Sequence, residues 1–204
     1  MPLLRTENKQ RGGTDFMKTD WKPGTLIYPV PAVMVSCGSA PDEYNILTVS
    51  WTGTICTDPA MCYISVRPGR HSYNIIKKNM EFVINLTNKE LAFAADWCGV
   101  RSGKEVDKFA EMKLTPGKAS IVSAPIIEEA PLSIECKVKE IVALGTHDMF
   151  VAEVVNVRAD AKFIDSETGA FDMEKAGLLA YAHGKYYELG QTIGKFGWSV
   201  KKEK

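Results

Sequence analysis

The sequence predicts a mainly β protein, an antiparallel barrel that is closed or split, with two or three helices inserted in the middle of the chain. Segments with strand character outnumber those with helix character, and the helices do not alternate regularly with the strands. A doubly wound parallel sheet would require such alternation. The Gly-x-Gly-x-x-Gly fingerprint of dinucleotide-binding folds and the Gly-x-x-x-x-Gly-Lys-Ser/Thr phosphate loop are also absent from the sequence.

The first half of the chain predicts an arm, four strands and a helix. Residues 1–20 show no apolar periodicity and are interpreted as a flexible N-terminal arm, so that residues 21–204 form a single domain. Pro29 and Pro31 keep the residues before them extended. Between two of the strands, residues 52–59 are rich in hydroxyl groups and end in a turn at Asp58-Pro59. The expected strands are 32–37, 46–51, 61–66 and 81–86, and the expected helix is 71–79.

The second half begins with helices and returns to strands. Thr87 and Glu90 have the spacing of a capping box, which predicts a helix running towards Gly99. A short helix is expected at 106–112, and a short strand at 162–164. From 132 to 144, apolar residues alternate with Glu135, Lys137 and Lys139, which is typical of an antiparallel strand with one solvated face. Residues 148–157 are its expected hairpin partner, after a turn at Gly145-Thr146.

Composition excludes several classes of function. The 204 residues include 25 basic and 25 acidic side chains, so the formal net charge of zero gives no general attraction to nucleic acid or to an anionic membrane. No apolar run is long enough to span a bilayer, and the N-terminus lacks the apolar core of a signal peptide, so we expect a cytoplasmic protein. The five cysteines form no Cys-x-x-Cys pair and the three histidines are far apart, so no metal site is expected.

The segment from Asn45 to Ser72 has the strongest functional signal. It combines Trp51 with closely spaced hydroxyl groups and ends in basic and hydroxyl side chains where a helix begins. A helix N-terminus offers free amide donors and the positive end of the dipole, so this cluster could bind a phosphate, and the hydroxyl groups could contact a planar heterocycle. Serine and threonine are also common on barrel strands, and an arginine near a helix start is often only solvated. The residues concerned are Ser50, Thr52, Thr54, Thr57, Arg67, Arg70, His71 and Ser72.

Several segments together resemble the flavin reductase-like, FMN-binding split-barrel family, over roughly residues 25–197. Each motif is loose, but their order and spacing are specific. Trp51 and the Asp-Lys-Phe triplet at 107–109 are similar to the flavoredoxin branch. The segments that carry the resemblance are 31–33, 45–51, 57–59, 67–75, 81–85, 107–109, 145–154 and 181–189.

The resemblance implies a mainly β fold, the FMN-binding split β-barrel with Greek-key antiparallel strands, and a set of flavin contacts. Asn45 and the stretch from Ser50 through Trp51, Thr52, Gly53 and Thr54 would face the isoalloxazine ring. Ser72, with Arg67, Arg70 and His71 nearby, would bind the phosphate, and Lys108 would add a charged hydrogen bond. His147 would lie near the reactive side of the ring as the candidate catalytic residue. Gly53 and Thr54 stand where many relatives carry serines, so their contacts are open.

Each of these residues also has an ordinary structural interpretation. Trp51 could belong to the core, Lys108 could be a solvated helix lysine, and His147 could be an exposed turn residue. Cys56 lies close in sequence to the predicted flavin contacts, so a redox-active thiol at this position is a further hypothesis.

Three functions remain open from the sequence. A flavin reductase would accept hydride from NADH or NADPH, and the cofactor, not the protein, would carry the chemistry. A flavoredoxin would keep FMN bound as an electron carrier between protein partners. A flavin-binding module would show no turnover. The resemblance also implies a homodimer with FMN near the interface, which would cover exposed barrel edges, and an electron-transfer protein or a monooxygenase as partner.

Overall fold

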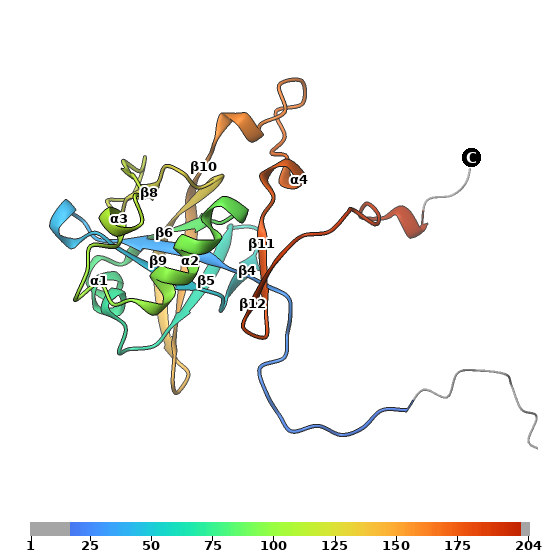
Figure 1. Ribbon diagram of the computed structural model, residues 1–204, viewed down its shortest axis with the longest axis horizontal. Helices are drawn as coiled ribbons and strands as arrows, with labels where there is room; N and C mark the ends of the chain where they lie inside the picture. Colours follow the sequence, from blue (N-terminus) through green and yellow to red (C-terminus); the bar gives the residue numbers. More distant parts are fainter. Residues whose placement is uncertain (1–16, 201–204) are drawn as a thin grey trace, which may run out of the picture.

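The computed structural model describes residues 17–200, and its largest element is a curled antiparallel sheet of seven strands (Figure 1). The strand order is β3-β2-β6-β9-β10-β5-β4, so the sheet forms a half-barrel whose edges are β3 and β4. The predicted mainly β split barrel is confirmed. The strands are β2 (Val33–Cys37), β3 (Asn45–Val49), β4 (Thr52–Cys56), β5 (Met61–Val66), β6 (Glu81–Leu86), β9 (Leu132–Ala143) and β10 (Asp148–Ala159).

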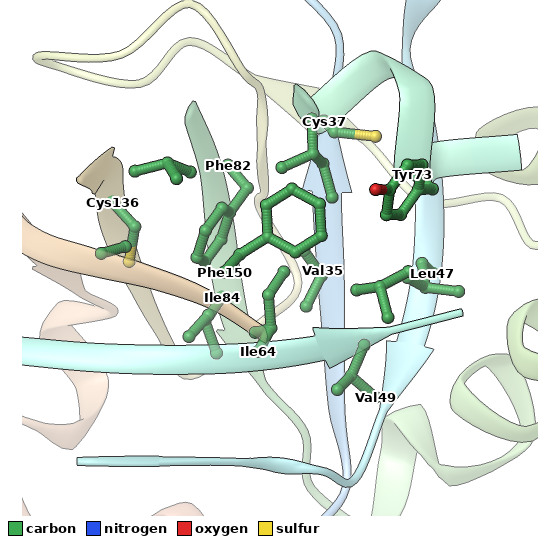
Figure 2. Close-up of a cluster of buried hydrophobic side chains, with 14 of the residues drawn as sticks. Val35, Cys37, Leu47, Val49, Ile64, Tyr73, Phe82, Ile84, Cys136 and Phe150 are labelled. Carbon is green, nitrogen blue, oxygen red and sulfur yellow. The ribbon is translucent and has the colours of Figure 1, made fainter. Parts of the chain in front are cut away.

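The main core fills the concave side of this sheet (Figure 2). Ile64, Phe82 and Phe150 are completely buried there, on three different strands. Burying a side chain of this size contributes about 1.5–3 kcal/mol relative to leaving it exposed. Helix α1 (His71–Asn79) closes one end of the core through Tyr73 and Ile76. Packing in this core therefore holds α1 against the end of the barrel where β5 ends.

A second apolar cluster lies on the outer side of β2 and β3. Met34 and Ile46 pack there against α2 (Ala92–Val100) and α3 (Lys108–Glu111). The alternation of strand side chains explains this arrangement, because Met34 and Ile46 point away from the face that carries Val35 and Leu47. These two strands are thus covered on both faces.

Two small sheets complete the regular structure. The strands β1 (Val30–Pro31), β11 (Leu179–Ala182) and β12 (Lys185–Glu188) form a three-stranded sheet in the order β1-β11-β12. The strands β7 (Pro116–Gly117) and β8 (Ile126–Ile127) pair with each other. The remaining short helices are α4 (Met173–Ala176) and the 3-10 turns η1 (Pro41–Glu43), η2 (Lys89–Leu91), η3 (Ala161–Phe163) and η4 (Trp198–Val200).

The predicted capping box at Thr87 is wrong. The Thr87 hydroxyl donates to the carbonyl of Ala32, and the side chain of Asn88 caps the turn by accepting from the amide of Leu91. The 3-10 turn η2 precedes α2, so the helix begins at Ala92, later than the pattern suggested. Because the Thr87 hydroxyl binds Ala32, just before β2, the neighbouring Asn88 is the residue that caps the turn.

One further local prediction is wrong. Residues 162–164 do not form a strand, because Asp160 caps the 3-10 turn η3 by accepting from the amide of Lys162. Residues 52–56, to which the sequence assigned no element, form the edge strand β4 and pair with β5. The backbone of β4 is thus used in the sheet.

Glu135 does not lie on a solvated face, in contrast to the simple alternation expected for its strand. Its side chain is 0% exposed, whereas Lys137 and Lys139 are exposed as predicted. The carboxylate accepts from the amides of Ser120 and Ile121 at 2.9 and 2.6 Å. It also accepts from the amide of Val122 and from Asn156 Nδ2. Glu135 therefore binds an irregular segment, residues 118–123, to the sheet.

Segments without helix or long strand lie at both ends of the described chain (Figure 1). Residues 17–29 form no regular element, and residues 1–16 of the predicted arm at 1–20 lie outside the described residues. Residues 189–200 extend away from β12 and carry exposed apolar side chains, which are Leu189, Ile193, Phe196, Trp198 and Val200. None of the helices from residue 17 to 200 is long and apolar enough to cross a bilayer.

Candidate functional site

Two adjoining cavities form one cleft where β3, β5 and the turn between β9 and β10 come together. Their volumes are about 260 and 510 Å³. Four residues line both cavities, namely Ser50, Trp51, Ser65 and His147. A bend at Ser50 and Trp51, between β3 and β4, places both residues in the cleft lining. The cleft is therefore built from segments far apart in the sequence.

The smaller cavity is polar and carries two arginines. Arg67 follows β5 directly, and Arg70 is the residue before the first turn of α1. Both side chains are exposed, and Arg70 Nη1 donates to the carbonyl of Gly99 at 3.3 Å. Arginine beside a helix N-terminus favours the binding of a phosphate or carboxylate.

The larger cavity is mostly apolar. Its lining adds Leu26, Ile27 and Val30 from the N-terminal segment, Tyr63 from β5, and Leu144 from the β9–β10 turn. The ring of Tyr28 lies 6.3 Å from the ring of Trp51, centroid to centroid, with the two ring planes at 43°. A flat aromatic ligand could therefore bind against Trp51 with its polar end towards the arginines.

His147 is positioned at the junction of the two cavities by the turn between β9 and β10. Its Nδ1 lies 3.0 Å from Thr146 Oγ1. Partial burial lowers the pKa of the imidazole from its ordinary value of 6.5, and the charges of Arg67 and Arg70 lower it further. The ring is thus mainly neutral at pH 7, with one nitrogen able to donate a hydrogen bond and the other able to accept one.

A second polar group lies deeper, beneath the start of β3. Asn45 Nδ2 donates to Ser72 Oγ at 2.7 Å, and both side chains are buried. Lys108 is 4% exposed, and its ammonium donates to the carbonyls of Ile46 and Cys98 at 2.7 and 2.6 Å. Burial lowers the pKa of Lys108. An ammonium has three donor hydrogens, so one of them is not used by these two carbonyls.

The structure brings only part of the predicted set into the cleft lining. Ser50, Trp51, Arg67, Arg70 and His147 line it together. Asn45, Ser72 and Lys108 lie in the deeper group, and His71 is half-buried at the start of α1, where burial and Lys104 lower the pKa of its ring.

The residues predicted from β4 are not part of the cleft lining. Thr52 Oγ1 donates to the carbonyl of Tyr63 at 2.6 Å, so this hydroxyl stabilises the β4–β5 pair. Gly53 lies against the Tyr63 ring, where an added Cβ would be 3.3 Å from Cε1. Thr54 is exposed. Thr52, Gly53 and Thr54 lie outside the cleft lining because their strand pairs with β5.

Sequence reasoning missed several residues of the cleft lining, among them Tyr181, Ser65 and Thr146. Tyr181 reaches the cleft because β11 pairs with β1, a contact between positions about 150 residues apart. Ser65 and Thr146 lie beside predicted site residues, but single hydroxyl residues give no distinct signal. The alternation of Leu179 and Tyr181 before a glycine turn could have identified the strand that carries Tyr181.

Other features of the molecule offer less chemistry. Another cavity, of about 770 Å³, lies beside residues 116–123, and its charged lining consists of Asp107 and Lys118. Asp107 already caps α3 by accepting from two amides. Cys56 Sγ contacts the carbonyl of Asp58 and does not line the cleft. Among the described residues, no group of three potential ligands could hold a metal ion.

The cleft residues fit FMN by their chemistry. Two arginines and a helix N-terminus suit its phosphate, and the apolar cavity beside Trp51 suits a planar ring. The volume of the larger cavity, about 510 Å³, lies within the range of small-molecule sites. A split antiparallel barrel with such a cleft defines the class of flavin-binding split barrels.

The chain belongs to the family described as the flavin reductase like domain, whose family model matches residues 25–190. It is 29% identical to the flavoredoxin of Desulfovibrio vulgaris (Miyazaki F), with a TM-score of 0.84 over 91% of this chain and 100% of that one. It is 25% identical to the FMN-binding protein from Thermus thermophilus, with a TM-score of 0.72, over 88% of this chain and 100% of that one. An uncharacterized protein of Pyrococcus abyssi is 32% identical over 64% of this chain and 74% of its own length.

Proposed function

We propose that this protein binds FMN non-covalently and acts as a flavin reductase-like oxidoreductase, moving electrons from NADH or NADPH to flavin or on to an acceptor. The observation that supports this proposal is the cleft in which Arg67, Arg70, Trp51 and His147 face the same space. Membership in the flavin reductase like family supports it independently. Bound FMN would supply the capacity to accept hydride or single electrons, which protein side chains lack.

Different residues of the cleft would bind different parts of FMN. Arg67 and Arg70 would bind the phosphate, and the N-terminus of α1, which begins at His71 and Ser72, would add its dipole. Trp51 and Ser50 would contact the ring. The deeper group of Asn45, Ser72 and Lys108 would hold the inner wall rigid, and the remaining Lys108 hydrogen would be available to the ribityl phosphate.

His147 would orient the reacting partners from the junction of the two cavities. Because its imidazole is neutral at pH 7, it can donate a hydrogen bond without adding a charge beside the ring. Trp51, Tyr63 and Leu144 would exclude water from the larger cavity, in which a nicotinamide or another acceptor would bind. Thr54 and Gly53 have no role in this proposal, and Thr52 supports the site through the Tyr63 backbone.

A second candidate is a flavoredoxin-type carrier that keeps FMN bound and exchanges electrons with protein partners. The similarity to a flavoredoxin over all of that protein's length favours it. Reduction only by a protein donor would identify a carrier. Tight FMN binding with negligible NADH or NADPH oxidation would identify a binding module without turnover.

The assembly and partners follow from the same proposal. We expect a homodimer in the cytoplasm, with FMN near the interface and with an electron-transfer protein or a monooxygenase as acceptor. The apolar side chains exposed on residues 189–200 support association with a second copy. Zero net charge gives no reason to expect nucleic acid as a partner.

The first test is an absorbance spectrum of the purified protein after FMN addition and desalting. Retained flavin bands would support FMN binding. Anaerobic addition of NADH or NADPH would then bleach the bands if the protein is a reductase. A protein that neither retains flavin nor catalyses its reduction would contradict the proposed function.

A further inference from the structure

One hydrogen bond joins helix α1 to the start of strand β10, close in sequence to the cleft residues Arg70 and His147. The hydroxyl of Tyr73, in the first turn of α1, donates to Asp148 Oδ2 at 2.5 Å. Asp148 is the first residue of β10 and directly follows His147. The Tyr73 ring is buried in the main core, edge-on to Phe150 with ring centroids 5.4 Å apart (Figure 2). The bond therefore joins a rigid helix to the turn that carries the histidine.

The Asp148 end of this bond is connected to the charged residues of the cleft. Asp148 lies opposite Val66 in the β5–β10 pair, and Arg67 follows Val66. Arg70 begins the turn that contains Tyr73, since the amide of Tyr73 donates to the carbonyl of Arg70. Arg67 and Arg70 are also the charges that act on His147. Asp148 thus directly follows one cleft residue, His147, and lies diagonally across the β5–β10 pair from a second, Arg67.

We propose that Tyr73 is a positioning residue, which binds the Asp148 carboxylate and thereby leaves Arg67, Arg70 and His147 free to face a bound anion. Asp148 accepts the Tyr73 hydrogen bond and stays directed to α1. Without the hydroxyl, the carboxylate would lose its donor on α1, and Arg67, Arg70 and His147 would compete for it with Lys77, whose Nζ lies 5.6 Å from the centroid of the Tyr73 ring. The carboxylate would then neutralise the arginines and attract a proton to the imidazole.

The inference rests on the proposed function for its ligand but can be tested without it. Tyr73→Phe removes the hydroxyl and keeps the ring in the core. Tyr186→Phe is the matched control, because the Tyr186 hydroxyl also donates to an aspartate, Asp96, at 3.1 Å, and neither residue lines the cleft. Asp148→Asn in the Tyr73→Phe background removes the freed charge.

Two measurements report on the link. In Tyr73→Phe, FMN dissociation constants from fluorescence titration should rise about tenfold, the effect of one lost charged contact. The FMN dissociation constant should change less than about twofold in Tyr186→Phe. In Tyr73→Phe/Asp148→Asn it should return to within about threefold of the wild-type value, because the competing carboxylate charge is gone. In the flavin-free protein, the NMR titration midpoint of His147 should rise in Tyr73→Phe alone, because a nearby carboxylate stabilises the imidazolium.

The outcomes separate this inference from the proposed function. If wild type binds FMN but Tyr73→Phe shifts neither the dissociation constant nor the His147 titration, the positioning role is refuted and the function stands. If FMN affinity falls in Tyr73→Phe and the Asp148→Asn change fails to restore it, the effect is structural and the inference is also refuted. If wild type binds no FMN, the proposed function fails, while the His147 titration still decides the link between Tyr73 and Asp148.

Discussion

Arg70 is the residue whose substitution best tests a phosphate site. Arg70→Gln should weaken FMN binding about tenfold to hundredfold, since a charged hydrogen bond to phosphate is lost. Riboflavin, which has no phosphate, should bind both proteins equally. Arg101→Gln is the control, because Arg101 is exposed and does not line the cleft. An equal loss for riboflavin in titration calorimetry would show that Arg70 does not contact the phosphate.

His147 should affect turnover more than flavin binding. We expect His147→Gln to lower NADH- or NADPH-dependent flavin reduction at least about tenfold, as for loss of a positioned hydrogen-bond donor, and FMN affinity less than about threefold. Because the folded pKa of His147 is below 6.5, the wild-type rate should fall only as the pH drops below that value. Stopped-flow rates between pH 5 and 8 measure both effects. His183→Gln, at an exposed position outside the cleft lining, should leave the rates unchanged.

Glu135 couples stability to pH. Burial alone would raise the pKa of its carboxyl, but the amides of Ser120, Ile121 and Val122, together with Asn156, lower the net pKa from the ordinary 4.5. The stabilisation is therefore present above the unfolded pKa of about 4.5 and is lost as the pH falls through the lower folded pKa.

Glu135→Gln should reduce the free energy of unfolding by about 1–3 kcal/mol at pH 7, because one amide group cannot replace both carboxylate oxygens as acceptors. The difference from wild type should narrow as the pH falls below 4.5. Urea unfolding at several pH values measures it. Glu140→Gln, at an exposed position on the same strand, is the control. A difference that stays constant down to pH 3 would contradict the role of the charge.

The elements most important to the site are β3, α2 and α3, which Lys108 joins. Its ammonium binds a carbonyl of β3 and one near the end of α2, so it satisfies two acceptors at a buried junction. Favourable interaction with the last carbonyls of a helix adds to this contribution. This arrangement gives a physical reason for a buried lysine even before a ligand is considered.

Lys108→Met should therefore destabilise the free protein by about 1–3 kcal/mol, since two buried carbonyls lose their donor. Thermal unfolding of the flavin-free protein tests this expectation. Lys104→Met, an exposed lysine nearby, should be neutral. If Lys108→Met leaves stability unchanged and weakens FMN binding, the lysine serves the ligand and not the junction.

The long-range contacts of the elements explain which of them could be predicted. The limits of β5, α1 and β6 agree with the sequence pattern, because apolar spacing and the Pro68-Gly69 break are local signals. The strand character of β4 was hidden, because its stability comes from pairing with β5 and not from its own hydroxyl-rich sequence. The site followed the same rule. Arg67 and Arg70 were predicted from the basic and hydroxyl cluster at a helix start, and His147 was predicted from the family resemblance, whereas Tyr181 reaches the cleft through the distant β1–β11 pair.

At the scale of the whole molecule, residues 189–200 expose large apolar side chains. Ile193 is 92% exposed and Trp198 63%, and Phe196 is fully exposed. If the proposed homodimer forms, these side chains are suited to pack on the second copy. Replacing all three by serine should raise the dimer dissociation constant at least about tenfold, since aromatic side chains dominate interface energies.

Sedimentation equilibrium measures this effect directly. Serine substitution of Phe93, Val100 and Ile121, which are exposed elsewhere, should leave the association unchanged. A variant of residues 193, 196 and 198 that dimerises as tightly as wild type would show that residues 189–200 are not part of the interface.

The buried carboxylate of Glu135 has a consequence for hydrogen exchange. The amides of residues 120–122 lie in an irregular segment, yet each donates to a side chain that is anchored in the central strand β9. Their exchange with deuterium should therefore require the opening of β9 rather than the fluctuation of a loop. An irregular surface segment would then show the slow labelling that is usually seen for the centre of a sheet.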